Sequence, residues 1–189
     1  WMLDFTSYNK IQNIFGEMDI DLFASRLNYQ IDTYVSYRPD PTAFAVDAFS
    51  LDWSCFYAYA FPPFSVLGKI LQKMEQDQAR IVLVSPLWTS QLWFTKLLWL
   101  FVDTPRLPHT TYNLHLPWDP QRVHPLMENL KLFVCKLSGN PLDVKKFQAE
   151  LLTLSSNHGG LIQKHSMGHI SENGCFFAMN GKLIQIHQM

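Results

Sequence analysis

The sequence predicts an α/β fold in which a mainly parallel sheet is flanked by helices. Short, almost fully apolar segments, typical of buried strands, alternate with segments whose apolar residues recur every three or four positions, as in amphipathic helices. Alternation at such short spacing indicates β-α-β units, whose strands run parallel. The 189 residues are 48% hydrophobic and 14% aromatic, which is enough apolar material for one packed core.

The first quarter of the chain predicts one helix and two short strands. Residues 5–15 carry apolar side chains at helical spacing, and Gly16 suits the end of that helix. Residues 18–23 alternate acidic and apolar side chains, which favours a short strand. Residues 34–37 form a second strand, ended by the turn-forming residues 38–41. The helix residues expected to face the core are Phe5, Tyr8, Ile11, Ile14 and Phe15.

The middle of the chain predicts two strand–helix units. Residues 56–61 are aromatic-rich and nearly unbroken, as in a strand buried on both faces, and the following double proline ends the strand because proline cannot donate to a sheet ladder. Residues 64–76 return to helical spacing. Residues 81–84 indicate another buried strand, and residues 91–100 another helix. The apolar residues assigned to the inner faces of these helices are Val66, Leu67, Ile70, Leu71, Met74, Leu92, Phe94, Leu97 and Leu98, with Trp99 as a further candidate.

The last third of the chain changes character. Five prolines between residues 105 and 125 predict an irregular crossing. Residues 130–137 fit a late strand that closes the sheet, and Asn140-Pro141 is a helix start for a helix running to about Leu154. Gly, Ser, His and Asn then predominate, which predicts a flexible C-terminal tail. The expected division is an N-terminal helix and linker at 1–16, an α/β domain at 17–138, a helix at 139–154 and the tail at 155–189.

Composition excludes some classes of function. The three cysteines, Cys55, Cys135 and Cys175, are widely spaced and form no CxxC pair, which fits a reducing compartment. No apolar run reaches the roughly 18 residues of a membrane span. Residues 1–52 hold eight acids and three bases, a balance of −5, and the remainder holds eight acids and twelve bases, a balance of +4. This asymmetry is too mild to demand or exclude a nucleic-acid partner.

Two sets of residues follow predicted strands, where open α/β sheets bind ligands. The first runs from Asp19 to Ser25, with Asn28 close behind; Asp21 supplies a carboxylate, and the small side chain of Ala24 would let backbone N–H groups approach a cofactor. A strand end with a solvent-facing acid is the alternative interpretation of this set.

The second set is Ala60 to Ser65, at the end of the next buried strand. Its two prolines fix the backbone and leave carbonyl groups without local partners. The aromatic ring of Phe64 could stack on a flipped base. The alternative is an ordinary strand-to-helix corner.

The order of these motifs resembles that of phage-type Dam DNA N6-adenine methyltransferases over roughly residues 17–100. The resemblance rests on the first set with Asn28, on Asp47 and Trp53, and on Pro62-Pro63-Phe64-Ser65. A closer similarity is to the copies of this domain carried by DIRS-type, tyrosine-recombinase retrotransposon polyproteins. The segments that carry it are Asp21 to Asn28, Val46 to Phe49, Ala60 to Phe64, Pro86 to Trp88 and Leu137 to Gly139.

The resemblance implies a Rossmann-like sheet of methyltransferase type and S-adenosylmethionine as the cofactor, lined by Asp21, Phe23 and Ala24, with Asp47 as a hydroxyl partner. It implies a catalytic tetrapeptide at Phe61, Pro62, Pro63 and Phe64, whose first position is Asn or Asp in the family. The polar side chain and a proline carbonyl there accept hydrogens from the adenine amine. Phenylalanine has no acceptor, and loss of one such transition-state hydrogen bond costs about 100- to 1000-fold in rate.

Three functions remain open on this basis. The first is a retrotransposon-derived module with weak or absent methylation, acting as a spacer or as a domain that contacts DNA or RNA–DNA intermediates. The second is an active DNA adenine methyltransferase that uses the Pro62 carbonyl, and the third is a decayed reading frame. The resemblance also implies a ribonuclease H before residue 1, a tyrosine recombinase after residue 189, no membrane partner, and an intracellular location, cytoplasmic or nuclear.

A metal site is weighed and not expected. His165 and His169 are four residues apart, with His158 and Cys175 nearby, and such residues can ligate zinc. The surrounding Gly and Ser residues favour a histidine-containing tail without a rigid helix to hold the ligands.

Overall fold

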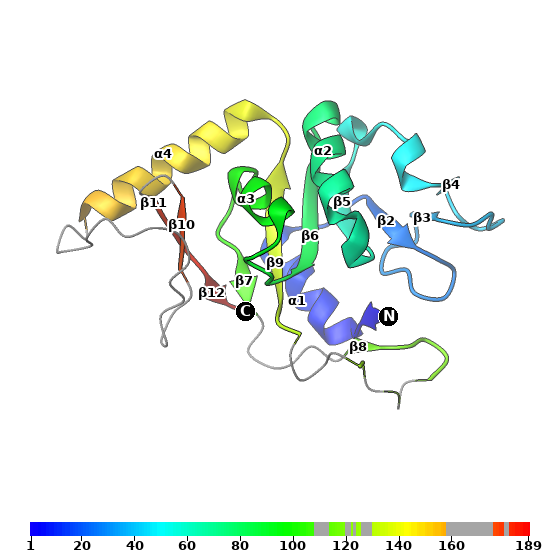
Figure 1. Cartoon of the computed structure of the whole chain (residues 1–189). Helices are drawn as coiled ribbons and strands as arrows, with labels where there is room; N and C mark the ends of the chain where they lie inside the picture. Colours follow the sequence, from blue (N-terminus) through cyan, green and yellow to red (C-terminus); the bar gives the residue numbers. More distant parts are fainter. Residues whose placement is uncertain (108–113, 120–121, 123, 126–129, 158–175, 180–181) are drawn as a thin grey trace.

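A computed structural model describes the whole chain except residues 108–113, 120–121, 123, 126–129, 158–175 and 180–181 (Figure 1). Its centre is an eight-stranded sheet with the strand order β12-β7-β9-β6-β5-β2-β3-β4. The strands are β2 (Ile20–Ala24), β3 (Tyr34–Ser36), β4 (Ala45–Val46), β5 (Tyr57–Ala60), β6 (Arg80–Pro86), β7 (Arg106–Leu107), β9 (Leu132–Ser138) and β12 (His187–Gln188).

The sheet is mostly parallel, as the sequence predicted. Strands β4, β3, β2, β5 and β6 all pair in parallel with their neighbours. Strand β9 is the exception, because it lies antiparallel between β6 and β7. Strand β12 pairs in parallel with β7 at the edge. The chain leaves β2 toward β3 and β4 on one side, and β5 leads to β6 on the other, so the strand order reverses between β2 and β5.

Helices cover both faces of the sheet. Helix α1 (Phe5–Phe15) packs on one face, where Tyr8, Ile11 and Phe15 are buried against β-strand residues such as Val82 and Val134. Helices α2 (Leu67–Asp77) and α3 (Leu92–Trp99) belong to the larger core on the other face. Short 3-10 turns lie at η1 (Ala48–Ser50), η2 (Trp53–Cys55) and η3 (Phe64–Val66), and α4 (Pro141–Asn157) lies near the β7 edge, at the opposite end of the molecule from β3 and β4 (Figure 1).

The expected helices and strands are therefore present, with boundaries that shift by a few residues. Helix α1 begins where the Asp4 carboxylate accepts the Ser7 amide at 2.9 Å, and it ends at Gly16, whose φ of 89° favours glycine. Helix α4 begins beside Asn140, whose side chain accepts the Leu142 amide at 2.9 Å.

Some apolar residues assigned to the core are instead exposed. Leu92 is 99% exposed and Phe5 is 72% exposed. Each is the first residue of its helix, and helical side chains lean toward the N-terminus, so these two project past the surface that their helices bury. Ile14 and Trp99 also keep 38% and 40% of their surface.

The flexible tail expected at 155–189 is wrong for its last part. The described residues there form β10 (Phe176–Met179), β11 (Lys182–Gln185) and β12. Strands β10 and β11 pair antiparallel, and α4 packs against β11. Burial explains the order, since Phe177, Ile184 and Ile186 join the larger core at 6%, 0% and 6% exposure. Residues 158–175 lie outside the described part of the chain.

A second small sheet lies beside the main one. Strand β1 (Met2–Leu3) pairs antiparallel with β8 (Leu114–His115), and together they bring the first residues of the chain beside α1 (Figure 1). No helix in the described part of the chain is both long and apolar enough to cross a membrane.

Candidate functional site at the β2–β5 switch point

A pocket lies where the strand order reverses, between β2 and β5. Asp21 and Tyr59 are register partners in these two parallel strands, and both line it. Ligands of open α/β sheets bind in the crevice beyond the carboxyl ends of the strands at such a point. The pocket encloses about 200 Å³, including space open to solvent, and its lining residues are Trp1, Met2, Leu3, Asp21, Phe23, Asn28, Gln30, Tyr59 and Phe61.

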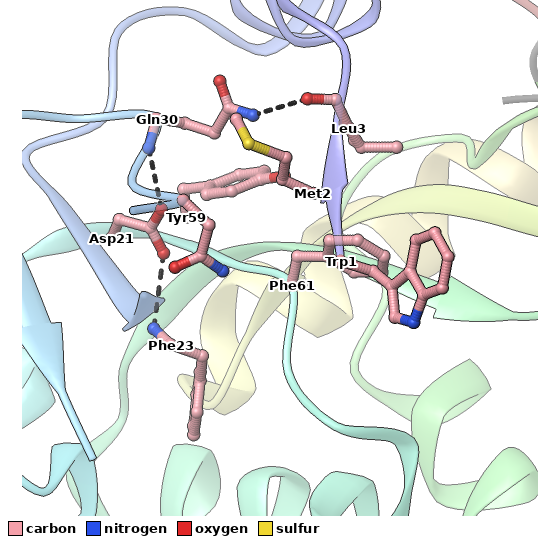
Figure 2. A pocket seen from close by; sticks show the side chains of 9 residues that line it. Trp1, Met2, Leu3, Asp21, Phe23, Gln30, Tyr59 and Phe61 are labelled. Atoms are coloured by element: carbon pink, nitrogen blue, oxygen red, sulfur yellow. Dashed lines mark hydrogen bonds between the residues drawn. The ribbon is translucent and has the colours of Figure 1, made fainter. Parts of the chain in front are cut away.

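The floor of the pocket is the Asp21 carboxylate, whose residue is only 2% exposed. One oxygen accepts the Phe23 amide at 3.3 Å, and the other accepts the Gln30 amide at 3.1 Å (Figure 2). Burial raises the pKa of Asp21 to about 7, and the two backbone hydrogen bonds oppose that rise. The carboxyl group therefore changes its charge near neutral pH, inside a pocket at the ligand-binding edge of the sheet.

Strand β1 forms one wall of the same pocket. The side-chain amide of Gln30 donates to the Leu3 carbonyl at 2.8 Å, while the Gln30 backbone holds Asp21 (Figure 2). Trp1 and Met2 are half-buried, and the Trp1 ring lies edge-on to His124 with centroids 4.6 Å apart. The chain's own first residues thus occupy space in front of the buried carboxylate.

Phe61 lies directly after β5 and lines the pocket with an apolar ring. Its centroid is 6.4 Å from that of Phe64, and the Phe64 ring lies edge-on to Trp88 at 5.2 Å. Pro62 is buried and Pro63 is exposed. The four residues of the expected catalytic tetrapeptide therefore form one corner between β5 and η3, and only Phe61 among them lines the pocket.

The other expected cofactor residues divide into two groups. Phe23 lines the pocket and packs edge-on against Phe49 and Trp53, at centroid distances of 5.7 and 6.2 Å. Ala24, 8% exposed, ends β2 beside it. Asp47 is exposed, does not line the pocket, and accepts the Phe49 amide at 3.1 Å from a backbone with φ of 62°. The structure therefore gathers Asp21, Phe23 and Phe61, and it reaches Asp47 through the Phe49 ring.

Several pocket residues were not predicted from the sequence. Tyr59 could have been found, because it stands two positions before Phe61 in a strand and so faces the same side. Gln30 and residues 1–3 carried no local signal, since their position depends on the β2–β3 connection and on the pairing of β1 with β8.

A cofactor of the size of S-adenosylmethionine does not fit this pocket as β1 leaves it. The donor groups are suitable, because a carboxylate can face the positive sulfonium and ammonium groups, and Phe23 can contact an adenine ring. The space is not, because pockets for such ligands enclose about 300–1,000 Å³, against about 200 Å³ here.

Metal ligation has no support in the described residues, which contain no group of three or more His, Cys, Asp or Glu residues placed to hold an ion. His158, His165, His169 and Cys175, weighed above as zinc ligands, lie outside the described residues. Cys55 is exposed and Cys135 is buried, both as free thiols.

Comparisons with known proteins add no further assignment, since a scan against family models, a search of curated proteins and a search of solved structures each found no match. The site is therefore interpreted from its own geometry.

Proposed function

We propose that this chain is a methyltransferase-fold module of a DIRS-type retroelement polyprotein that takes S-adenosylmethionine and transfers methyl groups to adenine weakly or not at all. In this proposal it is a spacer or nucleic-acid-contacting domain between a ribonuclease H and a tyrosine recombinase, inside the cell. The observation that carries the proposal is Phe61, an apolar ring that lines the switch-point pocket at the place where the resemblance requires an amide or a carboxylate.

The strand order supports the methyltransferase part of the proposal. Strands β4-β3-β2-β5-β6-β9-β7 follow a doubly wound order with one antiparallel strand, β9, inserted next to the last of the central parallel strands. Methyltransferase-type sheets differ from dinucleotide-binding sheets in having such an inserted strand. The two motifs of the resemblance then fall at the ends of adjacent strands, β2 and β5, as a shared cofactor and substrate site requires.

The chemistry of the tetrapeptide supports weak or absent transfer. Two acceptors on the adenine amine would localise its lone pair toward the methyl donor. The backbone carbonyl of Pro62 can supply one, whereas the Phe61 side chain supplies none. A missing acceptor of this kind costs about 100- to 1000-fold in rate, and the Phe61 ring also takes up space beside the pocket.

The test is methyl transfer to adenine-containing single- and double-stranded DNA under saturating S-adenosylmethionine, for the wild type and for Phe61→Asn. The proposal predicts transfer near background for the wild type and a rise of about 100-fold or more for Phe61→Asn. Phe61→Leu is the matched control, because it shortens the apolar side chain without adding an acceptor, and it should stay near background. Wild-type transfer equal to that of Phe61→Asn would refute the proposal and favour an active methyltransferase that uses the Pro62 carbonyl.

A further inference from the structure

Strand β1 stands between the cofactor and its site. With β1 in place the pocket encloses about 200 Å³, and three of its nine lining residues, Trp1, Met2 and Leu3, belong to that strand. The remaining lining residues include the Asp21 carboxylate and the Phe23 ring, the groups suited to a cationic, adenosine-bearing ligand. The mismatch between suitable groups and insufficient space therefore originates in β1.

The attachment of β1 is slight. It is a two-residue strand whose only partner strand among the described residues is β8, itself two residues long, with Met2 opposite His115 and Leu3 opposite Leu114. An isolated pair of strands is at best marginally stable. Short elements of this kind open at a lower free energy cost than the central strands of a domain. Leu3 adds a hydrophobic anchor, because it is fully buried against the α1 side of the sheet.

Gln30 connects β1 to the buried carboxylate. Its side-chain amide donates to the Leu3 carbonyl at 2.8 Å, and its backbone amide donates to Asp21 at 3.1 Å (Figure 2). Any shift of the β2–β3 connection that accommodates a ligand at Asp21 is therefore transmitted to β1. A cation held against Asp21 would offset the cost of burying its negative charge, which gives the ligand a preference for one state of the pocket.

The geometry points to a strap, namely β1 with its Gln30 hydrogen bond, that closes the switch-point pocket and must move aside before S-adenosylmethionine binds. This inference rests on the proposed function, because it concerns the regulation of the same pocket. Loosening the strap strengthens cofactor binding, and fixing it blocks binding, since a ligand that binds one state is weakened by the fraction of molecules in the other.

The first test is titration of S-adenosylmethionine into the full chain carrying Gln30→Ala. This change removes the bond to Leu3 and keeps the backbone bond to Asp21. One lost hydrogen bond corresponds to binding about 3- to 10-fold tighter than in the wild type. Gln72→Ala, an exposed position on α2, is the matched control and should leave binding unchanged.

The second test fixes the strap reversibly with Met2→Cys and His115→Cys, which are opposite each other in the β1–β8 pair. The other three cysteines are replaced by serine or alanine to avoid mispairing. The oxidised protein should lose binding by more than 10-fold, and reduction should restore it. Equal binding in the oxidised and reduced forms would overturn the strap and leave the proposed cofactor untouched.

Hydrogen exchange separates the two ideas where no variant binds. The strap predicts that the Leu3 amide exchanges much faster than amides in β2, without ligand. Exchange as slow as in β2 overturns the strap. Absence of S-adenosylmethionine binding in every folded variant, the reduced double-cysteine protein included, overturns both the proposed cofactor and the strap as its gate.

Discussion

The burial of Asp21 predicts a pH-dependent loss of stability that one substitution should remove. The carboxyl group is 2% exposed, and burial raises its pKa to about 7 from an ordinary value of 3.8. The folded protein therefore holds a proton that the unfolded chain has already released. Between these two pKa values the unfolded state gains free energy from ionisation and the folded state does not, so the free energy of unfolding falls as pH rises.

The size of the effect follows from the two pKa values. Below pH 3.8 the group is protonated in both states and contributes nothing. Each further pH unit up to about 7 removes up to about 1.4 kcal/mol, so roughly 2.5 kcal/mol is lost between pH 5 and pH 8. Above pH 7 the group is ionised in both states and the loss stops growing.

Asp21→Asn isolates this contribution. The amide has the shape of the carboxylate and can accept one of the two backbone N–H groups, but it does not ionise between pH 5 and pH 8. At pH 5 the variant should be the less stable protein, because one hydrogen bond is lost. At pH 8 the difference, wild type minus variant, should have shifted by roughly 2.5 kcal/mol in favour of the variant.

Urea unfolding at pH 5 and pH 8, followed by tryptophan fluorescence, measures this difference directly. Other titrating groups cancel because they are shared by both proteins. Parallel stability curves for the wild type and Asp21→Asn would refute the account, since they would mean that Asp21 ionises in the folded protein as it does in the unfolded chain.

Three further substitutions test the packing in urea unfolding experiments. A Cβ on Gly139 would lie 1.9 Å from the Met74 carbonyl oxygen, so Gly139→Ala should cost about 3 kcal/mol or more, while Gly68→Ala, with only an ordinary contact at 3.9 Å, should be tolerated. Trp53 is fully buried and its indole donates to a main-chain carbonyl at 2.7 Å, so Trp53→Ala should cost about 3–5 kcal/mol. Leu92 is 99% exposed, so Leu92→Ser should change stability by less than about 0.5 kcal/mol; a large loss there would contradict the placement of α3.

The strands and helices that the sequence predicted well are those with a strong local pattern. Residues 56–61 and 81–84 are apolar without interruption because both faces of β5 and β6 are covered by helices. Local pattern could not predict β1 or β10 to β12. These strands are two to four residues long, and they form through contacts with distant segments, as β12 does with β7.

The candidate site was predictable only where its residues end strands. Asp21 and Phe61 follow the rule that open α/β sheets bind ligands beyond their carboxyl ends, and both line the pocket. Gln30 lies in a connection, and its role depends on a hydrogen bond to Leu3, 27 positions earlier in the chain. Neither the narrowness of the pocket nor the identity of its wall could be derived from residues near the motifs.

Calorimetric titration of S-adenosylmethionine into the full-length chain tests the central claim most directly. The account predicts measurable binding by the wild type and binding at least 10-fold weaker by Asp21→Asn, which keeps the shape of the pocket and removes its negative charge. A well-folded wild type that binds no S-adenosylmethionine, or an Asp21→Asn variant that binds it equally well, would contradict the assignment of the β2–β5 pocket to this cofactor.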